Sequence, residues 1–282
     1  MNKKHSAVVR LILFSVIAVV LVGVLAWGIG GKPLLRHIKT SVVSQNSVTL
    51  AEGTPIRASD VDELEISWVA GDVRIVPGTQ EEITVTEELL NSDHPMILRQ
   101  DGSRLVVDFC ESSWYTSLSV PKKNLTVTLP AGWSGKRLKV NLVSAGLTCS
   151  DAAFEQLELS TVSGAYTFQR CGAGDMKVES VSGNLNFTGT LRQLKFDGVS
   201  ARVNLTAQEA PERIQMNSIS GDLELTLPAG CGFTLNNSSL SGRLDTDFPT
   251  TEQGGSTISG NGACQIELNG VSAGVHIRQG EQ

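Results

Sequence analysis

Between residues 157 and 225, apolar positions recur in one fixed pattern. The stretch divides into four lines of twelve residues, which begin at Leu157, Met176, Leu194 and Ile214 and therefore lie 19, 18 and 20 residues apart. Positions 1, 3, 6, 10 and 12 of every line are apolar, and positions 7 and 8 are Ser followed by Gly or Ala. The chain thus contains an internal repeat of about 19 residues.

Each line predicts two short strands joined by a bend. Apolar residues at positions 1 and 3, and again at 10 and 12, alternate with polar ones, which is the pattern of strands with one buried face. Glycine tolerates the backbone angles of a tight bend, and serine can hydrogen-bond to its own backbone there. One such rung cannot bury its apolar side alone, but stacked rungs can. We therefore expect an all-β protein, a β-solenoid with rungs of about 19 residues.

Four further copies fit the template. They begin at Leu64, Leu138, Phe233 and Ile266, and the copy at Phe233 requires two inserted residues before its Ser-Gly bend. The alternative is an ordinary β-sandwich with alternating strands, but sandwiches rarely keep a fixed sequence period. At position 5 the first copy carries Trp68, which the template places on the outside as a contact point or an edge cover.

The N-terminus predicts one membrane-spanning helix. Residues 1–10 contain Lys3, Lys4 and Arg10 without any acid, and residues 11–31 contain no charge. About 20 apolar residues span the roughly 30 Å hydrocarbon core of a bilayer. We expect a signal-anchor helix at 11–31 with residues 1–10 in the cytoplasm; the alternative is a cleaved signal peptide, for which the run is long.

The remaining chain is expected outside the cytoplasm, as a single-pass protein of the cell membrane. Residues 32–61 form a juxtamembrane linker, and residues 62–280 form the β-strand-repeat ectodomain. After residue 10 the chain has 20 basic and 29 acidic residues, a formal net charge of −9. This acidic balance disfavours nucleic acid as a partner, whereas divalent cations, basic peptides and neutral glycans are compatible with it.

Outward positions of stacked rungs form polar columns, and position 4 gives the candidate binding face. A column of this kind can be a ligand or calcium groove, or simply a solvated face of the sheet. The dense Gly-Asp pattern of calcium-binding β-rolls is absent, so no cofactor is expected, while neutral columns suit sugar hydroxyls. The position 4 column consists of Asn141, Ser160, Glu179, Asp197, Asn217 and Asn236.

The five cysteines show neither zinc nor CxxC redox spacing. Cys149 occupies an inward position 12 and is expected to be a buried thiol. Cys231 and Cys264 each precede a repeat start by two residues. If no rung intervenes, they stack about 4.8 Å apart, which is within reach of a disulfide. We therefore take a Cys231–Cys264 bridge as a hypothesis.

Enzyme signatures are missing from the sequence. None of the four histidines has a spaced partner typical of a metal site or a catalytic triad, and the sequence has no GxSxG, Walker or HExxH motif. We expect a non-catalytic protein with a role in binding, adhesion, scaffolding or envelope sensing, whose partner is a glycan, the cell wall or another envelope protein. The alternatives are a polysaccharide lyase or hydrolase on a β-helix and a purely structural assembly subunit.

The bends also resemble a known bacterial family over residues 60 to 280. That family is the "putative adhesin" domain of unknown function, a β-strand-repeat ectodomain common in membrane-anchored envelope proteins. The resemblance implies a solenoid-like ectodomain at a bacterial cell envelope and brings no catalytic residues with it. It rests on Val162-Ser-Gly164, Val181-Ser-Gly183, Ile219-Ser-Gly-Asp222, the opening Leu64-Glu-Ile66 with Gly71-Asp-Val73-Arg-Ile75, and Leu129-Pro130.

Overall fold

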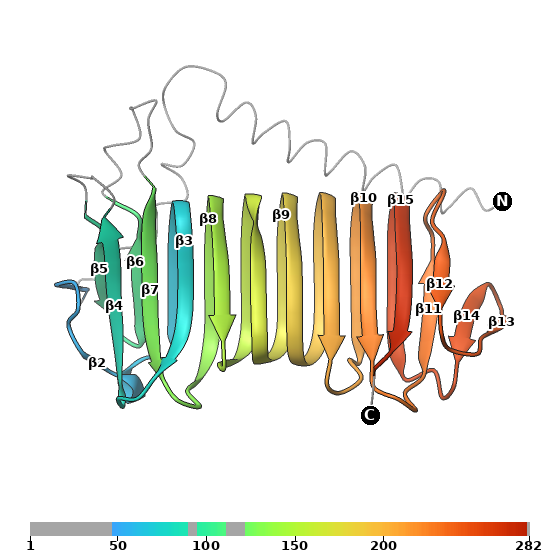
Figure 1. Cartoon of the computed structure of the whole chain (residues 1–282), viewed down its shortest axis with the longest axis horizontal. Coiled ribbons are helices and arrows are strands. Elements are labelled where there is room, and N and C mark those ends of the chain that lie inside the picture. Colours follow the sequence, from blue (N-terminus) through green and yellow to red (C-terminus); the bar gives the residue numbers. More distant parts are fainter. Residues whose placement is uncertain (1–46, 90–94, 111–121, 281–282) are drawn as a thin grey trace, which may run out of the picture.

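The chain winds into a solenoid whose rungs stand side by side (Figure 1). A computed structural model describes residues 47–89, 95–110 and 122–280. Neighbouring rungs pair in parallel, and the strands form one 15-stranded sheet in the order β1-β5-β6-β3-β8-β9-β10-β15-β11-β14-β13, with β2, β4, β7 and β12 attached beside this path. The expected all-β repeat fold is confirmed for the described residues.

Several strands continue through the bend and contain both straight segments of a rung. We call positions 1–5 of a rung its first segment and positions 9–12 its second segment. The 55-residue β9 holds three complete rungs. The strands are β1 (Val48–Leu50), β2 (Ile56–Arg57), β3 (Glu63–Gly78), β4 (Glu82–Leu89), β5 (Ile97–Asp101), β6 (Arg104–Asp108), β7 (Lys123–Pro130), β8 (Ser134–Ser150), β9 (Ala153–Ala207), β10 (Arg213–Leu227), β11 (Phe233–Asn237), β12 (Leu244–Thr246), β13 (Thr251–Gln253), β14 (Ser256–Ser259) and β15 (Cys264–Gln279).

Equivalent template positions lie opposite one another in the central rungs. Leu138 of β8 pairs with Leu157 of β9, and Ile214 of β10 pairs with Leu194 of β9. Because the register preserves the repeat, every position forms a column along the solenoid, with rungs about 4.8 Å apart. The repeat read from the sequence therefore gives the correct pairing in the middle of the domain.

The order of rungs departs from chain order at both ends. Leu64 of β3 pairs directly with Leu138, and the intervening residues form β4 to β7 at the N-terminal end. At the other end β15 lies between β10 and β11, since Ile266 pairs with both Ile214 and Leu235. The copy expected to begin at Phe233 is thus the outermost rung of the repeat at this end. Its position 1 is Leu235, two residues later than expected, so the template fits without inserted residues.

Inward-facing side chains continue through position 5 instead of stopping at position 3. Trp68 is 1% exposed, so the expected outward contact point is wrong. Leu142, Thr161 and Ser180 at the same position are also buried. Strand alternation places positions 1, 3 and 5 inside, and the bend then turns two consecutive residues, 6 and 7, outward.

The ordered domain begins before the boundary expected from the sequence. Strands β1 and β2 lie within the 32–61 segment assigned to a linker, where β1 pairs with β5 and β2 with β4. Ile56 and Val61 are buried in the core. Residues 1–46, including the expected spanning helix at 11–31, lie outside the described residues. Among the residues that are described, no helix has the length and apolar character needed to cross a membrane.

Candidate functional site

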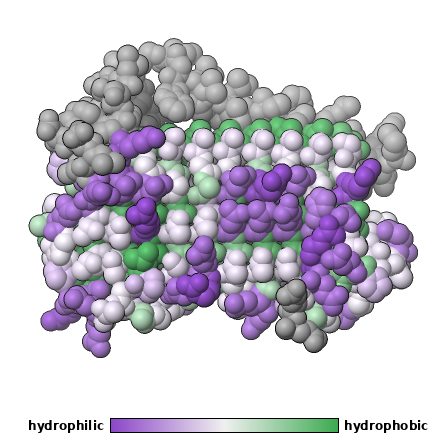
Figure 2. All heavy atoms as spheres, viewed as in Figure 1, coloured by the Kyte–Doolittle hydropathy of each residue, from purple (hydrophilic) through white to green (hydrophobic). Residues whose placement is uncertain are grey.

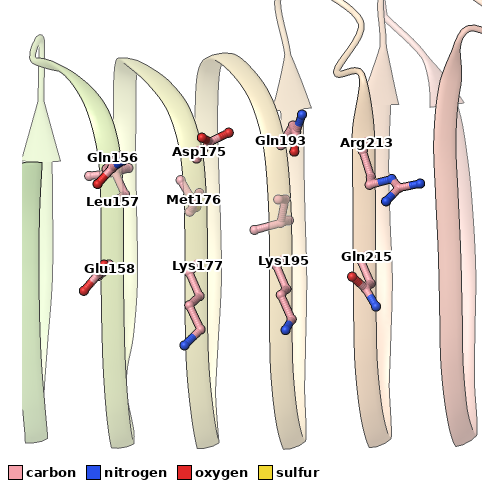
Figure 3. Close-up of a pocket in the computed structure, with 11 residues that line it drawn as sticks. Gln156, Leu157, Glu158, Asp175, Met176, Lys177, Gln193, Lys195, Arg213 and Gln215 are labelled. Atoms are coloured by element: carbon pink, nitrogen blue, oxygen red, sulfur yellow. The ribbon is translucent and has the colours of Figure 1, made fainter. Parts of the chain in front are cut away.

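The outward side of the first segments of β9 and β10 carries a shallow groove of ≈ 350 Å³ (Figure 3). It crosses four successive rungs. We call it the polar groove, and its polar lining consists of Gln156, Glu158, Asp175, Lys177, Gln193, Lys195, Arg213 and Gln215. These residues flank position 1 of their rungs, so they contribute two polar residues from each rung.

Strand alternation explains why these side chains face solvent. Leu157, Met176 and Leu194 at position 1 are buried in the core. The residues on either side of each must therefore point to the opposite face of the sheet. The groove is the direct consequence of a buried apolar residue placed between two polar ones in every rung.

Ion pairs fix the charged side chains along the polar groove. Arg137 Nη2 lies 2.6 Å from Glu158 Oε1, and Arg192 Nη2 lies 2.5 Å from Asp175 Oδ1. The hydrogen bond to Glu158 raises the pKa of the Arg137 guanidinium. Both acidic groups of the groove are thus already held by arginines.

Two lysines stand side by side in neighbouring rungs of the groove (Figure 3). Lys177 Nζ lies 2.7 Å from Glu179 Oε1, and Lys195 Nζ lies 3.6 Å from Asp197 Oδ2. The hydrogen bond with Glu179 raises the pKa of Lys177, so this ammonium group is charged at neutral pH. All four side chains of these pairs are substantially solvent-exposed and thus within reach of a ligand.

The amides of the groove supply uncharged donors and acceptors. Gln193 Nε2 donates to Glu212 Oε2 at 3.3 Å. Gln156 and Gln215 make no side-chain hydrogen bond within the part of the chain that the structure describes. Amide and ammonium groups on one flat face can donate hydrogen bonds to hydroxyl and carboxylate oxygens. Chemically the arrangement suits a hydroxyl-rich ligand, with or without carboxylates along its length.

Five of the six residues of the expected column lie on this same face, beside the polar groove. Asn141 pairs with Ser160, and Asp197 pairs with Asn217. The Asn217 amide donates to Asp197 Oδ1 at 2.7 Å. Glu179 occupies the β9 rung between Ser160 and Asp197. The column is therefore a structural neighbour of the groove, joined to it by the two lysine ion pairs.

Asn236 does not belong to the column, which corrects the expectation from the sequence. It lies opposite Glu267, a position 2 residue, because the outermost rung has the later register. The place next to Asn217 is taken by Asn269, whose amide donates to Asn217 Oδ1 at 3.0 Å. No local signal reveals this, since the change depends on β15 lying between β10 and β11.

An apolar ridge at position 6 is a feature that the sequence analysis missed. The bends turn a β-branched residue outward in seven rungs, and Val162 is 40% exposed. Figure 2 shows the corresponding apolar strip along the upper edge of the view, where the bends of β8, β9, β10 and β15 lie. The ridge consists of Val69, Val143, Val162, Val181, Val199, Ile219 and Val271. The sequence shows that position 6 is apolar, but it does not show that this side chain points outward.

The remaining candidates concern metals and cysteines. Within the described ranges no group of three or more His, Cys, Asp or Glu residues is placed to hold a metal ion. Cys231 and Cys264 do come from neighbouring rungs, since Phe233 pairs with Cys264. Both are free thiols, so the hypothesised bridge between them is not formed in this structure.

Comparison with known proteins agrees with this architecture. Residues 61–195 match the model of a family described as Toastrack DUF4097. This match covers 135 of the 282 residues, just under half of the chain. The resemblance to the "putative adhesin" family is thereby confirmed. The Toastrack match spans β3 to the start of the third rung of β9 and includes most of the polar groove.

Three solved structures are similar to the chain, and each is covered over nearly its whole length. A "putative cell adhesion protein" from Clostridium sporogenes is 10% identical with a TM-score of 0.40, covering 83% of this chain and 100% of that one. A "putative adhesin" from Bacteroides fragilis is 11% identical with a TM-score of 0.44 (83% and 98%). A "Putative lipid binding protein" from Parabacteroides distasonis is 12% identical with a TM-score of 0.38 (83% and 96%). A search of curated proteins found no match.

Proposed function

We propose that this protein is a non-catalytic cell-envelope protein whose Toastrack solenoid binds an extended glycan along the polar groove. In this proposal residues 11–31 anchor the chain in the cell membrane, because they form a run of 21 residues without charge. The solenoid is held outside the cytoplasm, where cell-wall and surface glycans are found.

The polar groove is the observation that carries the proposal. It crosses four rungs and repeats similar polar groups at each of them, so it matches a ligand that itself repeats. The unpartnered amides of Gln156 and Gln215 and the ammonium groups of Lys177 and Lys195 are hydrogen-bond donors for sugar hydroxyls and carboxylates. Basic side chains gathered in one groove of an acidic protein favour an anionic glycan over a neutral one.

The rigidity of the surface supports a binding role. Every residue of the groove sits on β9 or β10, whose pairing continues from Arg213–Gln193 to Thr226–Thr206. A backbone that is already ordered loses little conformational freedom when a ligand binds. The proposal therefore requires no rearrangement of the backbone.

The two alternative functions find less support in the geometry. A glycosidase uses two carboxylates as acid and base or nucleophile, yet Glu158 and Asp175 are each engaged by an arginine. A subunit that stacks end to end needs an open terminal strand. Strand β13 at the C-terminal end is three residues long with every side chain polar and exposed, which is how natural proteins protect an edge.

Binding by variants with neutralised lysines tests the proposal. The full-length protein in detergent micelles is titrated with peptidoglycan fragments and with a uronic-acid polysaccharide, and binding is followed by calorimetry. Replacing both groove lysines (Lys177→Gln and Lys195→Gln) is expected to weaken binding of the acidic ligand at least about tenfold, since each lost charge-assisted hydrogen bond contributes about 1.5–3 kcal/mol.

The matched control removes charge at residues that do not line the polar groove. Arg202→Gln on β9 and Arg278→Gln on β15 also remove two positive charges and should leave affinity unchanged. Loss of binding in a triple alanine variant of Glu179, Asp197 and Asn217, with binding intact in the lysine variant, would move the site to the position 4 column. No saturable binding by the wild type would refute the glycan proposal.

A further inference from the structure

Two cysteines from adjacent rungs meet in the core near the end of β8. Cys149 Sγ and Cys171 Sγ lie 3.9 Å apart, and the residues are 0% and 2% exposed. Cys149 pairs with Phe168 across the β8–β9 ladder, and Cys171 lies three residues after Phe168 in the chain. The sequence gives no indication of this contact. There are 21 residues between the two cysteines, and they become neighbours only because the chain completes one rung between them.

The corner beside these thiols has an unusual backbone. Asp151 and Arg170 have positive φ angles of 54° and 53°, and they are the two non-glycine residues with positive φ in the described chain. They stack in neighbouring rungs, where Arg170 Nε and Nη2 donate to the two carboxylate oxygens of Asp151, each at 2.6 Å. Strained non-glycine residues persist where surrounding contacts impose them, and they often mark functional positions.

The two thiols are chemically unequal. The hydrogen bond with Cys149, followed by backbone groups at Ala152 and Gln169, lowers the pKa of Cys171 to about 7 despite its burial. The hydrogen bond with Cys171 and burial raise the pKa of Cys149. A thiolate is the nucleophile in thiol–disulfide exchange. The lower pKa of Cys171 and its 2% exposure, against 0% for Cys149, favour Cys171 as the attacking group and Cys149 as the resolving one.

We propose that Cys149 and Cys171 form an oxidisable dithiol that closes into a disulfide between two rungs. The oxidant is a disulfide, either of a small thiol or of a thiol–disulfide oxidoreductase. The Cys171 thiolate attacks one sulfur of the oxidant, breaks its S–S bond and releases one thiolate. Cys149, on losing its proton, then attacks Cys171 Sγ and displaces the second thiolate. The two cysteines lose two electrons and two protons, and the oxidant is reduced to two thiols.

The geometry needs only a local adjustment for the second step. A disulfide bond is about 2.05 Å long, so the two sulfur atoms must approach by about 1.9 Å from their separation of 3.9 Å. The first step needs the corner at Asp151 and Arg170 to open, because both thiols are buried. Arg170 directly precedes Cys171 in the chain, and the side chains of Arg170 and Asp151 are 64% and 35% exposed.

Peptide mapping of the native protein tests the proposal. The full-length protein in detergent micelles is incubated with oxidised glutathione near pH 8, the remaining thiols are alkylated, and a non-reduced tryptic digest is analysed by mass spectrometry. Trypsin separates the two cysteines into peptides 140–170 and 171–177. The expected product is these two peptides joined, with a mass about 2 Da below their sum because two hydrogens are lost.

Variants separate the pair from other cysteines and test the order of attack. In Cys149→Ser, Cys171 should keep the mixed disulfide with glutathione, because the resolving thiol is missing. In Cys171→Ser, Cys149 should remain unmodified. The control is the other neighbouring-rung pair, and the double variant Cys231→Ser, Cys264→Ser should still form the 149–171 link.

Two outcomes would overturn the proposal. One is alkylation of both Cys149 and Cys171 after oxidation of the wild type, with no joined peptide. The other is a joined peptide of 214–243 with 244–278 alone, which would mean that Cys231 and Cys264 are the oxidisable pair. Far-ultraviolet circular dichroism of each variant before oxidation shows that it is folded, so a missing link cannot result from an unfolded chain.

Discussion

The middle of the solenoid and its N-terminal end use one rung template but fill its interior differently. In the middle, position 5 holds small buried hydroxyl residues such as Thr161, Ser180 and Ser218. At the N-terminal end the same position holds Trp68, whose indole nitrogen donates to the backbone oxygen of Lys123 at 2.8 Å. The template specifies that the position is inside, and the neighbouring rung decides which side chain fits there.

A buried charge pair distinguishes the N-terminal end further. Lys123 Nζ lies 2.5 Å from Glu87 Oε1, and both side chains are 0% exposed. The ammonium group also lies 4.2 Å from the ring centroid of Phe109 and 5.3 Å from that of Trp68. The Phe109 carbonyl accepts a hydrogen bond from the same group. Removing two charges from water is expensive, so such a pair depends on all of these contacts together.

The difference follows from what covers each rung. A middle rung has a copy of itself on both sides, and small residues fill position 5 of the β9 and β10 rungs. The β3 rung has β8 on one side and β6 and β7 on the other, and these strands do not follow the repeat. The end of a solenoid needs its own contacts, and here they are aromatic and ionic.

The strongest test of this comparison removes the buried lysine. Lys123→Met should lower the free energy of unfolding by about 3–5 kcal/mol, because Glu87 is left as an unpaired buried charge. The control is Lys139→Met, since Lys139 pairs with Glu65 at 2.8 Å on a partly exposed face and should contribute less than about 1 kcal/mol. Urea denaturation measures both values.

A double variant sharpens the same result. Lys123→Met combined with Glu87→Leu removes both charges and should recover most of the lost stability, because replacing a buried ion pair by apolar residues is often neutral. If the single variant loses less than about 1 kcal/mol, the charge pair does not hold the N-terminal end together.

A smaller effect is expected at the bends of the middle rungs. A Cβ atom at Gly183 would lie 2.3 Å from the backbone oxygen of Gly164, which leaves no room for it. Gly183→Ala should therefore lower the free energy of unfolding by about 1–3 kcal/mol, because the backbone must move to make room for the new methyl group. The reverse change at the same template position, Ala201→Gly, should cost about 0.5–1 kcal/mol through added flexibility alone. Equal losses in the two variants would mean that the bends are not closely packed.

The smallest effect concerns the exposed Asp151–Arg170 pair. The hydrogen bond from Arg170 lowers the pKa of Asp151 below its ordinary value of 3.8. Its contribution to stability is therefore present above pH 3.8 and is lost as the pH falls through the lower folded-state pKa. Asp151→Asn should lower the Tm slightly at pH 7, and the gap between the variant and the wild type should close near pH 2. A gap that widens on acidification would contradict this.

Much of the fold is readable from the sequence because the period is a physical signal. Alternation places positions 1, 3, 10 and 12 inside, and pairing of Leu138 with Leu157 preserves the same register in the structure. The polar face carrying Asn141, Ser160, Glu179 and Asp197 follows from that register. The groove beside it was not recognised, although its residues flank the same buried position 1.

Other features required knowledge of which segments become neighbours. The position 6 residues are apolar and read as core, yet the bend turns Val162 to the surface. Asn236 lies outside the column because β15, a later part of the chain, lies between β10 and β11. The thiols of Cys149 and Cys171 lie 3.9 Å apart, whereas spacing alone favoured Cys231 and Cys264.

The sequence by itself determined the repeat, the strand character of each rung and the columns that a regular stack must produce. It did so because side-chain alternation and bend chemistry act over a few residues. Only the tertiary structure decided the order of rungs at both ends, the direction of the bend residues and the partners of Lys123, Glu87, Cys149 and Cys171. These features depend on contacts between segments that are distant in the chain. A local pattern of apolar and polar residues does not specify which distant segment packs against it.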